Sequence, residues 1–232
     1  DEDIEHYRLG DEPILYPDTD WFSIMMKPTS MQTQQNINIR GGTDMMKYFI
    51  SGGYFQQEGL FNSFSSLNSG YNPNINFKRY NIRANFDFEV SKRLSVNVDL
   101  SSIIANKSGN SDGSTDATRT AIGMLFYAPP FSSPGIIDGK IVDVVQAYTP
   151  NPIYYFMNGG YYKYFNNNLS TSVGFNYDLD FITQGLRVHG KVSNWNMMDN
   201  TKRYSKAMQS YQATKLKDGS MLYTPQRTVS PF

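Results

Sequence analysis

The sequence predicts an all-β protein, an antiparallel segment of a larger transmembrane β-barrel with six to seven long strands. Three observations lead to this prediction. Apolar and polar residues alternate over runs much longer than the roughly 5–6 residues of an ordinary strand. Short turns join these runs in pairs, and long connections separate one pair from the next. Short turns at one end and long loops at the other are typical of an outer-membrane barrel.

Composition excludes several classes of function. The 232-residue chain has 21 Lys and Arg against 21 Asp and Glu, so its formal net charge is zero. No basic run occurs, so nucleic acid is not an expected partner. Cys is absent, which excludes disulfides and thiolate metal sites. No apolar run of about 18 residues indicates a transmembrane helix. The chain begins at Asp1 without an initiating Met or a signal peptide, and we expect an internal piece of a longer protein.

Residues 1–34 are predicted to form a lead-in that contains a short helix. Its first residues are acidic, and Pro13 and Pro17 interrupt their weak helical pattern. Asp20 is a candidate N-cap for one or two helical turns over residues 21–26, which end before the next proline.

Residues 35–106 are predicted to hold four strands in two hairpins. In the first hairpin a Gly-Gly-Thr-Asp turn joins the strands. Pairing Ile39 with Tyr48, and Ile37 with Ile50, keeps the apolar faces together. The four strands are expected at residues 35–40, 47–57, 78–90 and 94–103.

The second hairpin is predicted to have a three-residue turn. This turn places Val90 opposite Leu94 and Phe86 opposite Val98, so that apolar side chains meet apolar side chains. A two-residue turn would break this match, and the three-residue turn is therefore preferred.

Residues 107–164 are predicted to be a long extracellular loop with a helix over residues 117–127. So long a loop is normally functional or disordered, and its aromatic content favours an ordered one. These aromatic side chains could stack on sugars, pack against a partner protein, pack against one another or form an interfacial girdle. The candidates for ligand binding are Tyr127, Phe131, Tyr148, Tyr154, Tyr161 and Tyr162.

A calcium site at residues 108–116 is a weaker candidate. Asn110, Asp112 and Asp116 could supply oxygen ligands, but the segment lacks the EF-hand spacing and its closing Glu. A solvated surface loop is the preferred interpretation, and neither a metal site nor a cofactor is predicted.

The clearest prediction is a hairpin over residues 165–196, because residues 171–181 alternate without a break. A turn at residues 183–184 would place Leu179 opposite Val188, and the neighbouring apolar residues would also face one another. The remaining residues, 197–232, are expected to be loop with a possible strand over 203–214.

The two faces of the predicted strands are assigned to different surroundings. A barrel presents apolar side chains to lipid and polar side chains to its lumen. The polar patch predicted for the lumen is Asp178, Asp180, Arg187 and His189. The side chains predicted to face lipid are Tyr48, Tyr54, Tyr80, Phe86, Phe88, Phe175, Tyr177 and Phe181.

Within the polar patch, ordinary cross-strand pairing is preferred over a contact with a ligand or a plug. The predicted register puts Asp180 opposite Arg187 and Asp178 opposite His189, and such exposed pairs are common and weak. A glycosidase pair of Asp178 and Asp180 is disfavoured because no apolar-walled carboxylate is evident. His189 as a metal ligand is disfavoured because only His6, in the acidic lead-in, could join it.

Five motifs occur in a fixed order over most of the chain, to about Asn196. They are YPDTDW, QNINIRGGTDMMKYFISGGYFQQEGLF, KRYNIRANFDFEVSKRLSVNVDLS, NPIYYFMNGGYYKYFNNN and QGLRVHGKVS. Each motif is weak alone, but together they resemble the SusC/RagA family of TonB-linked outer-membrane transporters. One departure is local, since Ile39-Arg40 stands where the family favours Ser-Gly.

The resemblance implies a barrel of about 22 strands, filled by an N-terminal plug with a TonB-contacting segment ahead of it. These leading elements are not recognised in the sequence, and six or seven strands cannot close so wide a barrel. The whole chain, residues 1–232, is therefore expected to be part of one receptor barrel without the plug. The resemblance also implies a SusD-like surface lipoprotein partner, a glycan or peptide cargo, and location in a Gram-negative outer membrane.

Two functions remain in view. The first is a wall segment of an importer without enzyme activity, since no Ser-His-Asp set, phosphate loop or HExxH motif occurs. The alternative is a secreted, soluble β-sandwich that binds carbohydrate through loop aromatics. A sandwich would cover the aromatic strand face with a second sheet about 10 Å away, whereas a barrel would leave that face to lipid.

Overall fold

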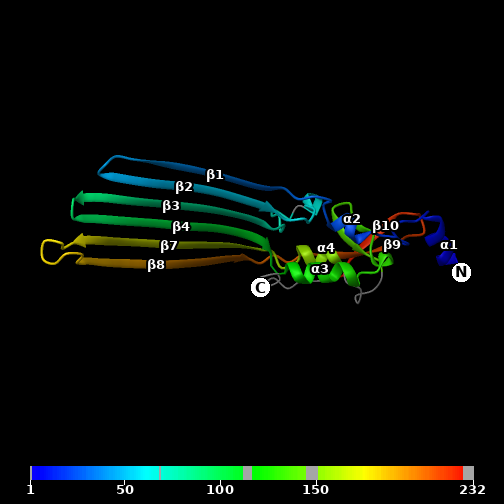
Figure 1. Ribbon diagram of the computed structural model, residues 1–232. Helices are drawn as coiled ribbons and strands as arrows, with labels where there is room; N and C mark the ends of the chain where they lie inside the picture. Colours follow the sequence, from blue (N-terminus) through cyan, green and yellow to red (C-terminus); the bar gives the residue numbers. More distant parts are fainter. Residues whose placement is uncertain (1, 68, 112–116, 145–150, 227–232) are drawn as a thin grey trace.

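The protein consists of a long six-stranded antiparallel sheet with a small folded domain at one end (Figure 1). The computed structural model describes residues 2–67, 69–111, 117–144 and 151–226. The sheet is a simple meander in the order β1-β2-β3-β4-β7-β8. Its strands are β1 (Gln32–Gly42), β2 (Met46–Glu58), β3 (Asn76–Ser91), β4 (Leu94–Asn110), β7 (Tyr161–Asp178) and β8 (Arg187–Tyr204).

The strands are much longer than those of an ordinary globular domain. β7 and β8 have 18 residues each, which corresponds to about 60 Å of extended chain. Crossing a bilayer takes only about 9–11 residues of a tilted strand, so both strands are long enough to cross and to continue beyond it. The predicted loop at residues 197–202 is wrong, because β8 runs through it to Tyr204.

The strand pairings give the sheet two distinct faces. Val98 pairs with Phe86 on one side and with Val173 on the other, so these three side chains share a face. Asp99 pairs with Asn85 and Ser172 in the same way, and these side chains lie on the opposite face. Side chains alternate between these two faces along all six strands, and the separation is clearest toward the turn end, since Phe55, Ile103 and Trp195 lie on the polar side nearer the loop domain. We refer to these surfaces as the apolar face and the polar face.

The first hairpin keeps the predicted facing but has a different register. Ile39 pairs with Ile50, and Gly41 rather than Ile39 lies opposite Tyr48. The turn begins two residues further along the chain than predicted, and the Thr43 hydroxyl accepts hydrogen bonds from the backbone N–H groups of Met45 and Met46, both at 3.3 Å. The slip is two residues, an even number, so every side chain stays on its predicted face.

The second hairpin keeps its apolar side chains on one face through a turn and a bulge that differ from the predicted three-residue turn. Phe86 pairs with Val98, as predicted, but the turn has only two residues because Ser91 pairs directly with Leu94. A bulge between Glu89 and Ser91 leaves Val90 unpaired, which corrects the predicted pairing of Val90 with Leu94. The extra residue restores the match that a two-residue turn would otherwise break.

The third hairpin is confirmed as a hairpin, but its register also differs by two residues. Tyr177 pairs with Val188, where Leu179 was expected, and Asp178 pairs with Arg187. The segment after Asp178 folds back as a compact loop, in which the backbone N–H of Leu179 donates to the carbonyl of Leu186 at 2.9 Å. Phe181, predicted to face lipid, lies in this loop and not on a strand, with the Arg93 guanidinium 4.7 Å from its ring centroid.

The long connections and the chain ends build a loop domain at the opposite end of the sheet (Figure 1). Residues 107–164 are therefore not an irregular loop, since β4 and β7 extend into this range and α3 confirms the predicted helix. The possible strand at 203–214 corresponds to β9, which belongs to a separate four-stranded sheet of order β10-β9-β6-β5. The strands of this sheet are β5 (Gly135–Ile137), β6 (Lys140–Asp143), β9 (Ser210–Lys215) and β10 (Met221–Pro225).

Short helices complete the loop domain, and two of them have a polar side chain as their N-cap. Asp20 accepts a hydrogen bond from the backbone N–H of Ser23 at 3.1 Å, which confirms it as the N-cap of α2. Asn151 accepts from the N–H groups of Ile153 and Tyr154 at the start of α4. The helical segments are α1 (Glu2–Leu9), α2 (Trp21–Met25), η1 (Ser65–Leu67), α3 (Thr118–Tyr127), η2 (Pro130–Ser132) and α4 (Pro152–Met157).

The hydrophobic core lies in the loop domain and not on the long sheet. Phe156 is fully buried, and its ring centroid lies 4.4 Å from that of Phe61. The core therefore joins segments that are far apart in sequence. Its members are Trp21, Met25, Phe61, Phe64, Ala121, Leu125, Ala128, Ile141, Ile153, Tyr154, Phe156 and Met157.

The acidic α1 is attached to the chain that follows it by a small polar and aromatic cluster. His6 pairs with Asp11 at 2.8 Å, and its ring stacks on Tyr16 with centroids 4.8 Å apart. The hydrogen bond to Asp11 raises the pKa of His6. The stability that this ion pair adds is therefore fully present at pH values below the ordinary pKa of histidine, and it is lost as the pH rises through the raised pKa.

We predict that Phe156→Ala opens the loop domain while leaving the long sheet intact. Truncating a buried Phe costs about 3–5 kcal/mol, and in this structure the cost falls on a core that the long strands do not share. Brief protease treatment of the membrane-embedded protein should nick the variant several-fold faster at residues of the loop domain.

Phe126→Ala is the matched control, because that Phe is 73 % exposed. It should be cut at the unaltered rate. Equal cleavage of both variants, or loss of the strand-protected fragment in Phe156→Ala, would contradict an independent core.

Candidate functional site on the polar face and the loop domain

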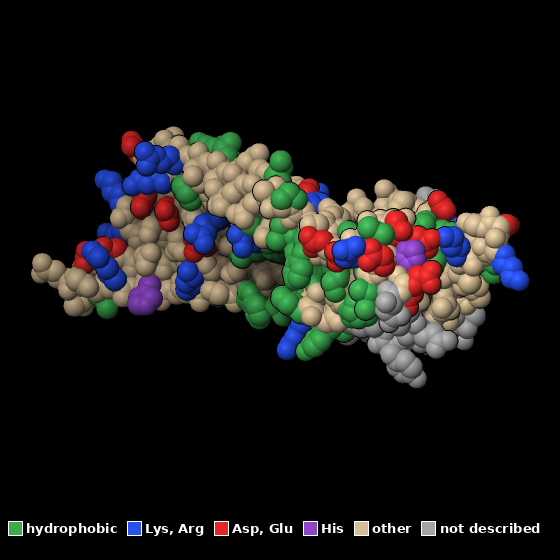
Figure 2. All heavy atoms as spheres, turned by 90° about the vertical axis from the view of Figure 1, so that its right-hand side faces the viewer, with side chains coloured by type: hydrophobic (Ala, Val, Ile, Leu, Met, Phe, Trp, Pro, Cys, Tyr) green, Lys and Arg blue, Asp and Glu red, His purple; other side chains and the backbone are tan. Residues whose placement is uncertain are grey.

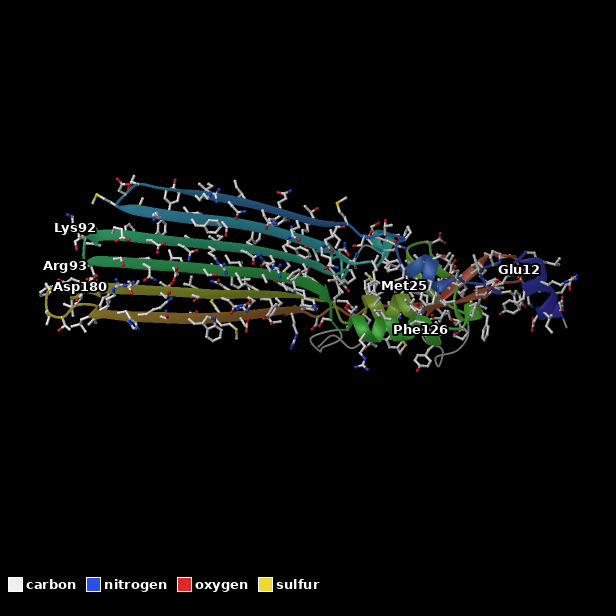
Figure 3. The ribbon with its side chains drawn as sticks, viewed as in Figure 1. Glu12, Met25, Lys92, Arg93, Phe126 and Asp180 are labelled. Carbon is white, nitrogen blue, oxygen red and sulfur yellow. The ribbon has the colours of Figure 1, made fainter. Side chains whose placement is uncertain are left out.

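The structure brings three of the four predicted patch residues together on the polar face. Asp178 and Arg187 are cross-strand partners, with Arg187 Nε 3.7 Å from Asp178 Oδ2. His189 lies on the same face opposite Asn176, and not opposite Asp178 as expected. Asp180 lies in the turn instead, where Oδ1 accepts the backbone N–H of Gly185 at 2.7 Å, so its predicted pairing with Arg187 is wrong. Figure 3 shows Asp180 near Lys92 and Arg93 at the turn end of the sheet.

A hydrogen-bonded network on the polar face was not found from the sequence. Asp99 accepts from Asn85 Nδ2 at 2.6 Å, from Ser172 Oγ at 3.0 Å and from Lys191 Nζ at 3.3 Å. These four residues come from four neighbouring strands, β3, β4, β7 and β8. The alternation alone places each of them on the polar face, but only the register shows that they meet. The network satisfies a carboxylate in the middle of the wall.

Seven of the eight aromatic residues predicted to face lipid share the apolar face. The register aligns Tyr48 with Phe86 and Tyr54 with Tyr80, and the latter two ring centroids lie 5.1 Å apart. The exception is Phe181, in the third turn. In the described residues, no second sheet pairs with or stacks over this face, since the small sheet lies beyond the strand ends (Figure 1).

The predicted ligand-binding aromatics divide into exposed and buried residues. Tyr127 is 75 % exposed and Phe131 is 48 % exposed on the loop domain. Tyr154 and Tyr162 are only 6 % and 3 % exposed, so both are corrected from ligand contacts to packing residues. The sixth candidate, Tyr148, lies outside the described residues.

Tyr161 belongs to an aromatic stack at the junction of the sheet and the loop domain. Its ring centroid lies 4.6 Å from Tyr204 and 5.3 Å from Tyr71, and both pairs are stacked. Burial raises the pKa of Tyr71 to about 12, and its hydroxyl donates to the carbonyl of Met157. Tyr161 therefore links β7 and β8 to the loop domain.

An exposed apolar ridge on the loop domain consists of Phe22, Ile122 and Phe126. The rings of Phe22 and Phe126 meet edge to face, with centroids 5.4 Å apart. Ile122 and Phe126 are four residues apart on α3, whose opposite side buries Ala121 and Leu125. Figure 2 shows hydrophobic side chains gathered in patches on one face of the molecule, and Figure 3 labels Phe126 at the edge of the loop domain. A ridge of this kind on an exposed surface is typical of a protein contact.

The candidate calcium ligands cannot be assembled from the described residues. Asn110 is buried and accepts a hydrogen bond from the Thr118 hydroxyl at 3.3 Å, while Asp112 and Asp116 lie outside the described residues. Within the part of the chain that the structure describes, no group of three or more His, Asp or Glu side chains could hold a metal ion. The helices of the described ranges are all too short or too polar to cross a membrane.

Two curated relatives match part of the sequence, whereas no family model matches it. TonB-dependent receptor P26 of Formosa agariphila is 29 % identical over 83 residues, which is 36 % of this chain and 7 % of that protein. TonB-dependent receptor P3 of the same organism is 32 % identical over 82 residues, 35 % of this chain and 7 % of that protein. The matched stretch is a small fraction of each relative's length.

Solved structures match over most of the chain. The RagAB peptide importer in its closed-closed state superposes with a TM-score of 0.55 and 24 % identity, covering 81 % of this chain and 20 % of that one. Its open-open state gives a TM-score of 0.57 at 21 % identity, covering 83 % and 21 %. This likeness shows the fold, and the described strands cover only a part of such a barrel. The chain is therefore similar in fold to a segment of the importer's β-barrel, and about a third of its sequence is similar to TonB-dependent receptors.

Proposed function

We propose that this chain forms part of the wall and extracellular loops of a transporter that imports an oligomeric nutrient, either a glycan or a peptide. The observation that carries the proposal is the two-faced sheet, with aromatic and aliphatic side chains on one face and a hydrogen-bonded polar surface on the other. Such a wall separates lipid from a wet passage. The chain spans 7 % of the curated relatives' length and about one fifth of the solved chains, and coupling to TonB is inferred from the relatives' names.

The exposed aromatic strand face favours this proposal over a soluble β-sandwich. A sandwich needs a second sheet about 10 Å from the first to bury its apolar face. In the described structure Ile82 is 52 % exposed, Val173 47 % and Phe175 43 % on this face. Lipid would cover these side chains in a barrel, whereas a soluble module would leave them in water. The relatives' names are those of receptors and importers, and we propose no enzyme activity.

We further propose that the ridge of Phe22, Ile122 and Phe126 contacts a surface lipoprotein partner, with Tyr127 and Phe131 nearby in the chain. The ridge lies on the loop domain, at the end of the sheet opposite the short turns (Figure 1). Long loops of outer-membrane barrels lie outside the cell, so the ridge would face a partner above the membrane. Exposed aromatic side chains are the usual anchors of protein interfaces.

Val173→Lys tests the proposed orientation of the wall. A lysine on the lipid face of a barrel costs about 2–4 kcal/mol near the middle of the bilayer, so unfolding in lipid vesicles should shift to a lower urea concentration. Ser170→Lys is the control, because it adds the same charge to the same strand on the polar face. Its unfolding midpoint should change little. Equal destabilisation by the two lysines would be incompatible with one lipid-facing side.

Phe126→Glu tests the proposed partner contact. A charge at the centre of an apolar contact should reduce co-purification of the surface lipoprotein by at least about tenfold, which is about 1.4 kcal/mol. Leu222→Glu is the matched control, since Leu222 is also exposed but lies on β10, away from the ridge. Undiminished co-purification with Phe126→Glu would remove the ridge from the interface without affecting the assignment of the wall.

A further inference from the structure

The polar face contains a hollow that the Asp99 network does not include. It has a volume of about 410 Å³ and lies over the middle of β1, β2, β3 and β4. Ser51, Arg83 and Ser101 form one row across its floor, as successive cross-strand partners. The adjacent row passes from Asn36 through Gly53 to Asn81. The two serines and Gly53 keep their part of the floor low, beside the longer side chains of Arg83 and Ile103, which also line the hollow.

Gly53 is the residue that makes room for the two amides beside it. A Cβ atom at this position would lie 2.9 Å from Asn36 Oδ1 and 3.5 Å from Asn81 Nδ2. The amide groups of Asn36 and Asn81 therefore reach across the space where a side chain would stand. Any larger residue at position 53 would displace them and reduce the volume of the hollow.

The hollow differs from the neighbouring wall in how its polar groups are satisfied. One row away, Asn85, Asp99 and Ser172 bond to one another. The Ser102 hydroxyl at the edge of the hollow donates to Asn167 Oδ1 at 3.3 Å. Among the described residues, no side-chain hydrogen bond or ion pair involves the other polar groups that line the hollow. These groups belong to Asn36, Asn38, Ser51, Asn81, Arg83 and Ser101.

We propose that this hollow is a binding subsite for an acidic peptide, with Arg83 pairing with a carboxylate of the peptide. The proposal rests on the proposed transport function, which places the polar face in the lumen. Arg83 brings a permanent positive charge and the geometry to hold a carboxylate through two parallel hydrogen bonds. Because the lining carries no acidic side chain, the charge is complementary to an anion.

The amide side chains specify an extended peptide as the carrier of that carboxylate. Asn36 and Asn38 lie two residues apart on the same face of β1, which separates them by about 6.6–6.8 Å. This is also the repeat of an extended peptide, in which every second residue turns its N–H and C=O groups to the same side. An Asn amide donates and accepts at once, so each can pair with one peptide group of a chain that lies along the strands.

Arg83→Gln separates the charge of the subsite from its shape. The experiment measures binding of a labelled tetraglutamate peptide and of its tetraglutamine analogue to the full-length protein in detergent. Arg83→Gln should weaken tetraglutamate binding about tenfold or more and leave tetraglutamine binding unchanged. Arg79→Gln is the matched control on the same strand and face, because the Arg79 guanidinium is already engaged with the Phe55 ring at 5.5 Å. It should leave both affinities unaltered.

A second variant, Gly53→Val, fills the hollow without removing charge and should weaken both peptides. Three results would overturn the proposal: equal loss for both peptides in Arg83→Gln, no loss in either variant, or tighter Arg83-dependent binding of a triuronate, which would assign the hollow to acidic glycans. A fall in thermal stability of ligand-free Arg83→Gln, with tetraglutamate affinity intact, would show that a carboxylate of the protein itself occupies the hollow and would also overturn it. Uptake of neutral peptides that survives these results would leave the proposed transport function standing.

Discussion

The parity of the strand register is the constraint on which the rest of this structure depends. Side chains alternate between faces with a period of two, so an odd shift between neighbours would move a whole strand's apolar set to the polar face. Two hairpins differ from the expected register, and both differ by two residues. The remaining hairpin, between β3 and β4, has a two-residue turn that alone would shift the register by one residue, and a bulge at Val90 cancels this shift. In all three cases the pairing changes while the two faces remain intact.

Because the register gathers apolar side chains on one face of the long sheet, the two parts of the molecule cover their apolar side chains in different ways. The long sheet has no buried hydrophobic layer of its own among the described residues, and its apolar face depends on its surroundings for cover. The loop domain instead packs Phe61, Phe156 and their neighbours into a core that needs no lipid. The stack of Tyr71, Tyr161 and Tyr204 joins the two parts. Strands that pass through lipid can therefore end in a water-exposed domain that remains folded.

Much of the sheet could be predicted from sequence, because alternation is a local signal. The faces of Phe86, Val98 and Phe175 followed from it directly. Turn geometry did not, because the Thr43 hydroxyl bonds, the Val90 bulge and the folded loop after Asp178 depend on contacts that alternation does not encode. The loop domain was missed as a domain, since its core joins residues as distant as Trp21 and Phe156. Tyr154 and Tyr162 were assigned to ligand binding because the sequence of a loop does not show which of its aromatic side chains are buried.

The most direct test of the account is a scan of single spin-labelled cysteines along β7 in lipid vesicles, which is straightforward because the chain has no native Cys. The relaxation of labels at Val173, Phe175 and Tyr177 should be enhanced most by oxygen, which concentrates in the bilayer. The relaxation of labels at Ser172 and Asn176 should be enhanced most by a water-soluble nickel complex. The account predicts that the reagent to which the label is more accessible alternates strictly from one residue to the next. Uniform access to the nickel complex at all five positions would contradict it.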